Sequence, residues 1–194
     1  AAERWQVEQR HSQFYLAYIA ERVTRLSRGE PRQACDEIQA ELDNIRQAWL
    51  WAIGQGELIG LDQAAFGWWQ FCLCRGLESE GRRTFALAVE GVRAWLAQHP
   101  DHRQQQLGLG LLSKLLAIHA NYLFAQGVDQ HMAEQAQLAI DLGRAHGGIE
   151  GEVIGTFVLG RARQDLGQHA EAGALWDKTV QLTQYYRQRL PHNE

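Results

Sequence analysis

Apolar residues recur along this chain at spacings of three and four, which is the period of one face of an α-helix. The clearest stripe consists of Ile38, Leu42, Ile45, Trp49 and Ile53, spaced four, three, four and four residues apart. Strict alternation of apolar and polar residues, the pattern of a half-buried strand, is almost absent. The pattern therefore predicts an all-α fold.

Glycine and proline separate the apolar stripes into eight predicted helices, because these residues end helices or form the turns between them. The helices are expected to carry the apolar positions within residues 15–26, 31–53, 58–75, 85–96, 111–122, 132–140, 154–166 and 172–186. Short glycine-centred turns between helices of similar length indicate that neighbouring helices pack as antiparallel hairpins.

The hairpins show signs of a repeat. Residues 159–176, LGRARQDLGQHAEAGALW, resemble the tetratricopeptide pattern of Leu-Gly, a turn glycine, a small residue and an aromatic. The same register fits around Gly76 and, more weakly, around Gly127, so successive turn glycines stand 51 and 40 residues apart. We therefore expect residues 57–194 to form about three tetratricopeptide-like hairpins, wound into a right-handed superhelix. The first two helices do not fit this repeat, and we expect residues 1–56 to form an N-terminal helical adaptor or cap.

Composition is typical of a soluble globular protein. Of the 194 residues, 45% are hydrophobic and 22% are charged, so the chain can bury a core without a disulfide or a metal. The net charge of −4 gives no argument for direct binding of nucleic acid, and no apolar run is long enough to span a membrane. Three cysteines without paired spacing, and no signal-peptide pattern, favour a reducing, cytoplasmic location.

Three motifs occur in order in the first half of the chain: RHSQFYLAYIAE at 10–21, ELDNIRQAWLWAI at 41–53 and GWWQFCLCRGLESEGRRTFALAV at 67–89. Each resembles a segment of the bacterial signal-transduction ATPases with numerous domains, which include LuxR-type and related transcription regulators. In that family these segments follow the nucleotide-binding and winged-helix domains and open a tetratricopeptide-like sensor region. The resemblance implies a non-enzymatic, cytoplasmic module for protein binding or ligand sensing in signal transduction and transcription regulation.

The chain has no GxxxxGK[ST] phosphate loop, so any ATPase activity would belong to another segment. Because the chain does not begin with Met and its sole methionine is Met132, we expect it to be a fragment of a longer protein. The nucleotide-binding domain of the same chain, absent here, is then one implied partner. We expect this part to need no cofactor.

Other chemistry finds little support in the residue pattern. Cys72 and Cys74 point about 200° apart on a helix, so they cannot share a metal or form a disulfide. We expect Cys72 and Trp68 to be core residues and Cys74 to point towards a groove. His131 and Glu134 stand three apart but lack the further ligands that structural zinc needs. We therefore predict no metal site and no catalytic residues.

The tetratricopeptide register implies a binding groove, because in such repeats the first helix of each pair lines the concave face. The position two after the Leu-Gly leucine faces that groove and corresponds here to Gln70, Asn121 and Arg161. Neighbouring groove positions are Phe66, Lys114, Phe124, Phe157, Gln164 and Asp165. Amides and an arginine beside phenylalanines suit an extended peptide, whose backbone needs hydrogen-bond partners and whose side chains need pockets.

Three functions stay open at this point. The first is a protein-interaction or ligand-sensing arm of a larger ATPase-type regulator, with a protein, a peptide or a small inducer in the groove. The second is a structural scaffold or oligomerisation arm, in which the predicted groove residues are merely solvated or covered by packing. The third is a helical enzyme domain that binds a small molecule, for which the sequence contains no cluster of titratable groups.

Overall fold

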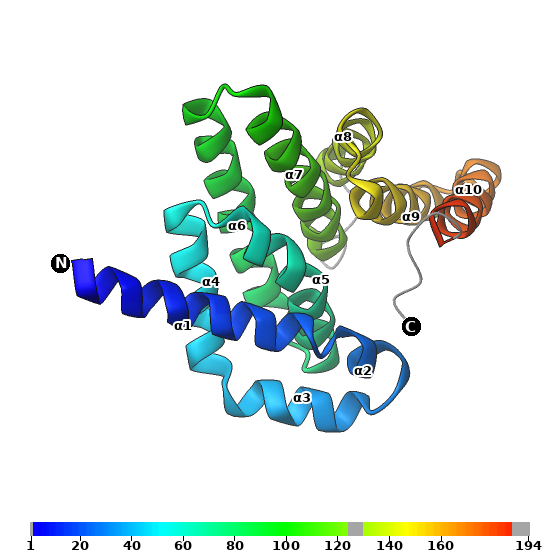
Figure 1. Cartoon of the computed structure of the whole chain (residues 1–194). Helices are drawn as coiled ribbons and strands as arrows, with labels where there is room; N and C mark the ends of the chain where they lie inside the picture. The colour runs from blue at the N-terminus through cyan, green and yellow to red at the C-terminus, as the bar shows by residue number, and fades with distance from the viewer. Residues whose placement is uncertain (1, 124–129, 188–194) are drawn as a thin grey trace. The chain divides into compact units, whose positions relative to one another are not determined.

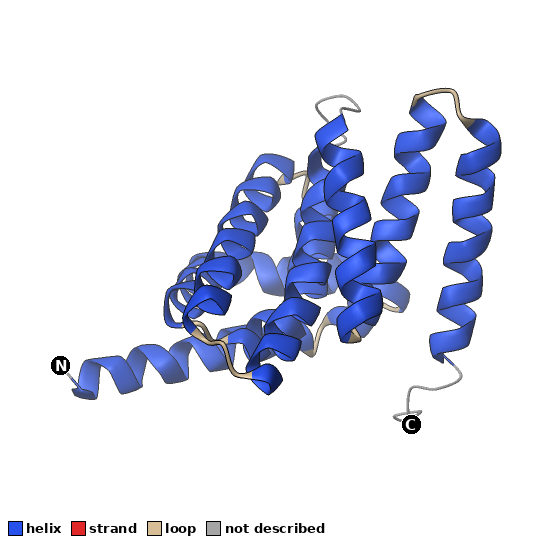
Figure 2. Cartoon of the chain, turned by 90° about the horizontal axis from the view of Figure 1, so that it is seen from above, coloured by secondary structure: helices blue, strands red, loops and turns tan. Residues whose placement is uncertain are grey.

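The computed structural model describes residues 2–123 and 130–187, and all regular secondary structure within them is helical (Figures 1 and 2). The all-α prediction is confirmed for these residues. The helices are α1 (Ala2–Ala20), α2 (Val23–Arg28), α3 (Pro31–Ala40), α4 (Leu42–Gln55), α5 (Leu58–Cys74), α6 (Glu78–Gln98), α7 (His102–Leu123), α8 (Gln130–His146), α9 (Ile149–Asp165) and α10 (His169–Arg187).

The chain divides into two units, Ala1–Trp95 and Leu96–Glu194. In the first unit, α1 lies across α4 and α5, and the short α2 and α3 pack against each other and against α5 (Figure 1). The boundary predicted between residues 56 and 57 lies within this unit, between α4 and α5, which pack together. The division into an adaptor and repeats stays a prediction.

All eight predicted helices are present, but the first is split into α1 and α2 near Arg22. The Arg22 amide donates to the carbonyl oxygen of Ile19, three residues back, instead of that of Tyr18. The Arg22 guanidinium donates hydrogen bonds to the Tyr18 carbonyl oxygen at 2.8 Å and to the Glu37 carboxylate at 2.8 Å. It also lies over the Tyr18 ring. No glycine or proline occurs at this break. The contact of Arg22 with Glu37 of α3 stabilises it instead.

The second predicted helix is split into α3 and α4 at Glu41 in a similar way. The Glu41 amide donates to the Ile38 carbonyl oxygen at 3.1 Å, and its own carbonyl accepts from the Ile45 amide at 3.0 Å. The Glu41 carboxylate accepts a hydrogen bond from the Tyr15 hydroxyl of α1 at 3.0 Å and one from Asn44 at 2.7 Å. Tertiary contact with α1 therefore accompanies this break also.

Glu37 at the α2–α3 contact gives stability a predictable pH dependence. Its carboxylate accepts from Arg25 at 2.8 and 2.9 Å and from Arg22 at 2.8 Å. These hydrogen bonds, those of Arg25 foremost, lower the pKa of Glu37 from 4.5 to about 2. Because the folded pKa lies below the unfolded one, the stabilisation is complete above about pH 4.5 and is lost as the pH falls towards 2.

We therefore expect the Glu37→Gln variant to be less stable than the wild type at neutral pH, and to lose less stability between pH 5 and pH 2. Urea unfolding followed by circular dichroism at several pH values measures both quantities. Glu21→Gln, a change at an exposed glutamate in the turn after α1, is the control and should follow the wild-type curve. Parallel curves for Glu37→Gln and the wild type would contradict the assignment.

Aromatic side chains from α4, α5 and α6 form the core of the first unit. Trp49 and Phe85 meet edge to face with ring centroids 5.5 Å apart, and Trp68 stacks on Phe71 at 5.6 Å. The two indole N–H groups donate to Thr84 of α6, that of Trp68 to the hydroxyl at 3.0 Å and that of Trp49 to the carbonyl at 3.3 Å. The predicted core position of Trp68 is confirmed, and Cys72 is likewise fully buried.

In the second unit, α7 packs against α8 and α9, and α9 packs against α8 and α10. Small residues let these helices approach closely: a Cβ added to Gly151 of α9 would stand 2.7 Å from the backbone nitrogen of Lys114 in α7. Ser113 of α7 donates a buried hydrogen bond to the carbonyl oxygen of Ala139 in α8 at 2.6 Å. Figure 2 shows α9 and α10 side by side, joined by a short loop.

Four of the glycines expected at helix ends adopt a left-handed backbone conformation, whereas Gly54, also expected to end a helix, lies within α4. Gly56, Gly76, Gly147 and Gly167 have φ between 66° and 77°, the left-handed region that glycine enters without steric cost. Gly127, another predicted turn glycine, lies outside the described residues. Over the ranges that the structure describes, no helix combines the length and the apolar character that crossing a membrane would require.

Candidate functional site

The face shared by α7 and α9 holds two of the predicted groove residues in direct contact. Arg161 Nη1 of α9 donates to Asn121 Oδ1 of α7 at 2.8 Å, and both side chains are half-buried. The repeat register had made these two positions equivalent, one in each hairpin. The structure thus brings them together as one polar pair, which we call the Asn121–Arg161 pair.

Partial burial changes the electrostatics of this pair. Desolvation lowers the pKa of Arg161 below its ordinary value, while the nearby carboxylate of Asp165 acts in the opposite direction. An arginine stays protonated at neutral pH even so. A partly desolvated cation attracts a polar or anionic group more strongly than a fully hydrated one, because less water screens the interaction.

An exposed aromatic side chain lies next to the pair along α9. Phe157, Arg161 and Asp165 are four residues apart, so they share one face of the helix. Phe157 is 41% exposed, a large fraction for a phenylalanine, while Asp165 and the neighbouring Gln164 are exposed polar residues. This face of α9 therefore offers an apolar surface, a cation and a carboxylate in sequence.

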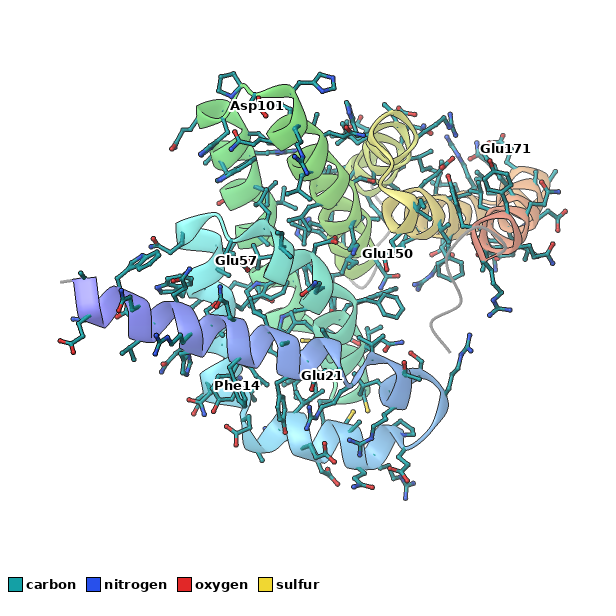
Figure 3. All side chains as sticks on the ribbon, in the orientation of Figure 1. Phe14, Glu21, Glu57, Asp101, Glu150 and Glu171 are labelled. Atoms are coloured by element: carbon teal, nitrogen blue, oxygen red, sulfur yellow. The ribbon has the colours of Figure 1, made fainter. Side chains whose placement is uncertain are left out.

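Lys114 has a different environment from the one expected of a groove residue. It is only 7% exposed, and its ammonium group is ion-paired with Glu150 in the first turn of α9 (Glu150 is labelled in Figure 3). A buried lysine is costly unless it is paired, so this contact explains its burial. The pair joins α7 to α9, which gives Lys114 a structural role.

The predicted groove residues of the first unit have partners within that unit. The amide of Gln70 donates to Ser27 Oγ of α2 at 3.0 Å. Phe66 is half-buried and meets the Trp69 ring edge to face, with centroids 5.5 Å apart. The remaining predicted residue, Phe124, lies outside the described residues.

A buried carboxylate in the second unit was missed by the sequence reasoning. Glu152 of α9 is buried and accepts hydrogen bonds from Arg144 Nε at 3.3 Å and from the Tyr186 hydroxyl at 3.0 Å. Burial, followed by the bond to Glu152, raises the pKa of Tyr186. Position alone could not reveal this cluster, because its members come from three helices and Glu152 reads as an ordinary acidic residue near a helix N-terminus.

Polar side chains also meet between α7 and α8. His119 Nδ1 lies 2.9 Å from Gln135 Oε1, and Gln135 Nε2 lies 2.9 Å from His131 Nε2. The histidines are thus connected through an amide. In the part of the chain that the structure describes, no three histidine, cysteine or acidic residues are grouped so as to hold a metal ion.

Comparison of the chain with protein-family models, with curated proteins and with solved structures gives no match. The resemblance to signal-transduction ATPases therefore stays a prediction that rests on the three N-terminal motifs. The function of the chain therefore depends on its own contacts. Among these, the Asn121–Arg161 pair and the exposed Phe157 offer hydrogen-bonding groups and an apolar surface on one face.

Proposed function

We propose that this chain is a non-enzymatic binding module, and that the α7–α9 face takes an extended segment of a protein partner. The observation that carries the proposal is the half-buried Asn121–Arg161 pair beside the exposed ring of Phe157. An amide and a guanidinium can form hydrogen bonds with a peptide backbone or a carboxylate, and an exposed ring provides an apolar contact for a side chain.

The wider architecture that we propose is a tetratricopeptide-like array. It is supported by the order of packing in the second unit, where α7 contacts α8 and α9, and α9 contacts α8 and α10. Helical hairpins that stack in this order place the first helix of each pair side by side, which is how Asn121 and Arg161 can meet. Continued over further hairpins, such stacking generates a right-handed superhelix with one extended binding surface.

We place this module in a bacterial ATPase-type regulator, on the strength of the three motifs between residues 10 and 89. Its mechanism would be differential binding: a partner that prefers one arrangement of the arm shifts the population of the whole regulator. A small inducer is the alternative occupant. A scaffold role is the second candidate, because Val7 and Phe14, two helical turns apart on α1, are both exposed.

Replacing Arg161 is expected to weaken peptide binding at least about tenfold, because a charge-assisted hydrogen bond is worth about 1.5–3 kcal/mol. A random peptide library displayed on phage would be panned on the purified chain, and a selected peptide would be synthesised. Its dissociation constant would then be measured by calorimetry for the wild type, Arg161→Ala and Asn121→Ala. Arg161→Lys, which keeps the charge but loses the planar fork, should give an intermediate loss.

The matched control is Arg163→Ala on the same helix. Arg163 donates to Gln168 at 3.0 Å and pairs with Glu171 at 3.5 Å, so it belongs to the end of α9 and the following turn. Its replacement should leave affinity within about twofold of the wild type. An equal loss of affinity in Arg161→Ala and Arg163→Ala, or selected peptides whose affinity does not depend on Arg161, would show that the α7–α9 face is not the binding surface. A stable dimer in light scattering would favour the scaffold instead.

The substitution of Gln70, Asn121 and Arg161 together tests the larger groove of the sequence prediction. If Gln70→Ala alone leaves the affinity for the peptide unchanged, Gln70 serves only the contact with Ser27 and does not bind the peptide. The binding surface then lies in the second unit. Circular dichroism and melting on each variant show whether the fold is intact, so a loss of binding can be assigned to the surface.

A further inference from the structure

Two cysteines that are distant in the sequence meet in the first unit. Cys35 of α3 and Cys74, the last residue of α5, are 39 positions apart, and their sulfur atoms lie 2.7 Å from each other. The residues that follow them also pair: Asp36 of α3 forms an ion pair with Arg75, the residue directly after α5. Two adjacent contacts therefore join α3 to the end of α5.

The two sulfur atoms differ in accessibility. Cys74 is exposed to solvent, whereas Cys35 is fully buried. Burial, followed by the contact with Cys74, raises the pKa of Cys35 from 9 to about 12. Cys35 is therefore a buried, protonated thiol at neutral pH, and the exposed Cys74 is the residue that an oxidant in solution would reach first.

Cys72 provides an internal comparison. It lies on the same helix as Cys74, two residues earlier, and is buried in the core. The two side chains project from different sides of α5, as the helical geometry requires. Only Cys74 combines exposure with a second sulfur atom at contact distance.

We propose that Cys35 and Cys74 form an oxidisable pair that closes to an intramolecular disulfide on exposure to a hydroperoxide. Hydrogen peroxide is the simplest oxidant of this class. The pair is a modification site independent of the α7–α9 face, and it does not rest on the proposed binding function.

The chemistry balances in two steps. The Cys74 thiolate attacks one oxygen of hydrogen peroxide; the O–O bond breaks, Cys74 becomes a sulfenic acid, and the released hydroxide takes a proton to become water. The Cys35 sulfur then attacks the Cys74 sulfur, the S–O bond breaks, and the thiol proton of Cys35 leaves with the hydroxide as a second water. In total, two thiols and one peroxide give one disulfide and two waters.

Proximity favours the second step. The resolving sulfur of Cys35 is already at contact distance, so the reaction is intramolecular and needs little reorganisation. The disulfide would tie α3 to α5 across 39 residues and hold the α2–α3 segment in place, including Ser27 on Gln70. In a reducing compartment the pair would return to thiols, as expected of a transient, redox-sensing bond.

Thiol titration tests the proposal directly. The reduced chain contains three cysteines, so denatured protein should yield three reactive thiols before treatment and one after hydrogen peroxide. Tryptic digestion should then give residues 33–46 linked to residues 47–75, with the link lost on reduction. Fragmentation of the linked peptide distinguishes Cys74 from Cys72 in the wild type, so the assignment does not require any variant to fold.

Two variants complete the experiment. Cys74→Ser, at an exposed position, should begin with two thiols and keep both after peroxide. Cys72→Ala, the matched control on the same helix, should begin with two and keep none. The proposal is overturned if Cys74→Ser loses thiols as readily as the wild type, if the link involves Cys72, if one thiol alone is oxidised further, or if non-reducing gels show a crosslinked dimer.

Discussion

Replacing Trp68 with alanine is expected to lower the free energy of unfolding by about 3–5 kcal/mol, the range for truncating a buried aromatic residue. Trp68 of α5 is fully buried, stacks on Phe71 and lies 6.3 Å from Trp49 between ring centroids. Its indole N–H also donates to the Thr84 hydroxyl at 3.0 Å. The variant therefore leaves a cavity among α4, α5 and α6 and deprives Thr84 of a donor.

Urea unfolding followed by circular dichroism measures this loss, with Leu73→Ala as the control. Leu73 lies on the same helix but is 45% exposed, and we expect its truncation to cost less than about 1 kcal/mol. The comparison separates core packing from helix propensity, because both variants place an alanine in α5. Equal losses in the two variants would show that the aromatic cluster does not dominate the stability of this unit.

Replacing Gly151 with alanine is expected to destabilise the second unit by about 1–3 kcal/mol, although alanine favours helices over glycine by about 1 kcal/mol. A Cβ at Gly151 would meet Ser113 Oγ, and it would also stand 2.6 Å from the Ser113 carbonyl carbon and 2.7 Å from the Lys114 nitrogen. A hydroxyl can rotate away, but backbone atoms cannot. We therefore expect α7 and α9 to move apart.

Gly173→Ala in α10 is the matched control with the opposite expected sign. A Cβ at Gly173 has no neighbouring atom within 4 Å, so alanine should stabilise this helix by about 0.5–1 kcal/mol. Thermal melting followed by circular dichroism compares the two variants. Shifts of the same sign would contradict the close approach of α7 and α9. If that approach positions the Asn121–Arg161 pair, Gly151→Ala should weaken peptide binding as well.

The location of the helices could be predicted because it depends on local information. Apolar residues at spacings of three and four indicate the buried face of a helix, and the structure has helices at all eight predicted places. Gly76, Gly147 and Gly167 were expected at turns, and each adopts a positive φ. The breaks near Arg22 and Glu41 could not be predicted, because each involves contacts with another helix.

The candidate site was only partly accessible to sequence reasoning. The repeat register predicted that Asn121 and Arg161 are equivalent, and they form a hydrogen bond. The register also placed Lys114 in the groove, but Lys114 is buried in an ion pair with Glu150. A register gives the direction in which a side chain leaves its helix, and the neighbouring helix decides whether that side chain is paired or exposed.

The cysteines show the same division. Helix geometry excludes a bond between Cys72 and Cys74, because two residues so close on one helix point in different directions. The contact between Cys74 and Cys35 could not be predicted, since nothing in a separation of 39 residues indicates that α3 passes the end of α5.

By itself, the sequence determined the helical class, the places of the helices, most of the turn glycines and the core positions of Trp68 and Cys72. These properties depend on periodicity and backbone preference, which act within a few residues along the chain. Only the tertiary structure decided which polar side chains meet, such as Arg22 with Glu37 and Cys35 with Cys74. Such contacts depend on how helices distant in the sequence pack, and packing is set by the shape of whole helix faces.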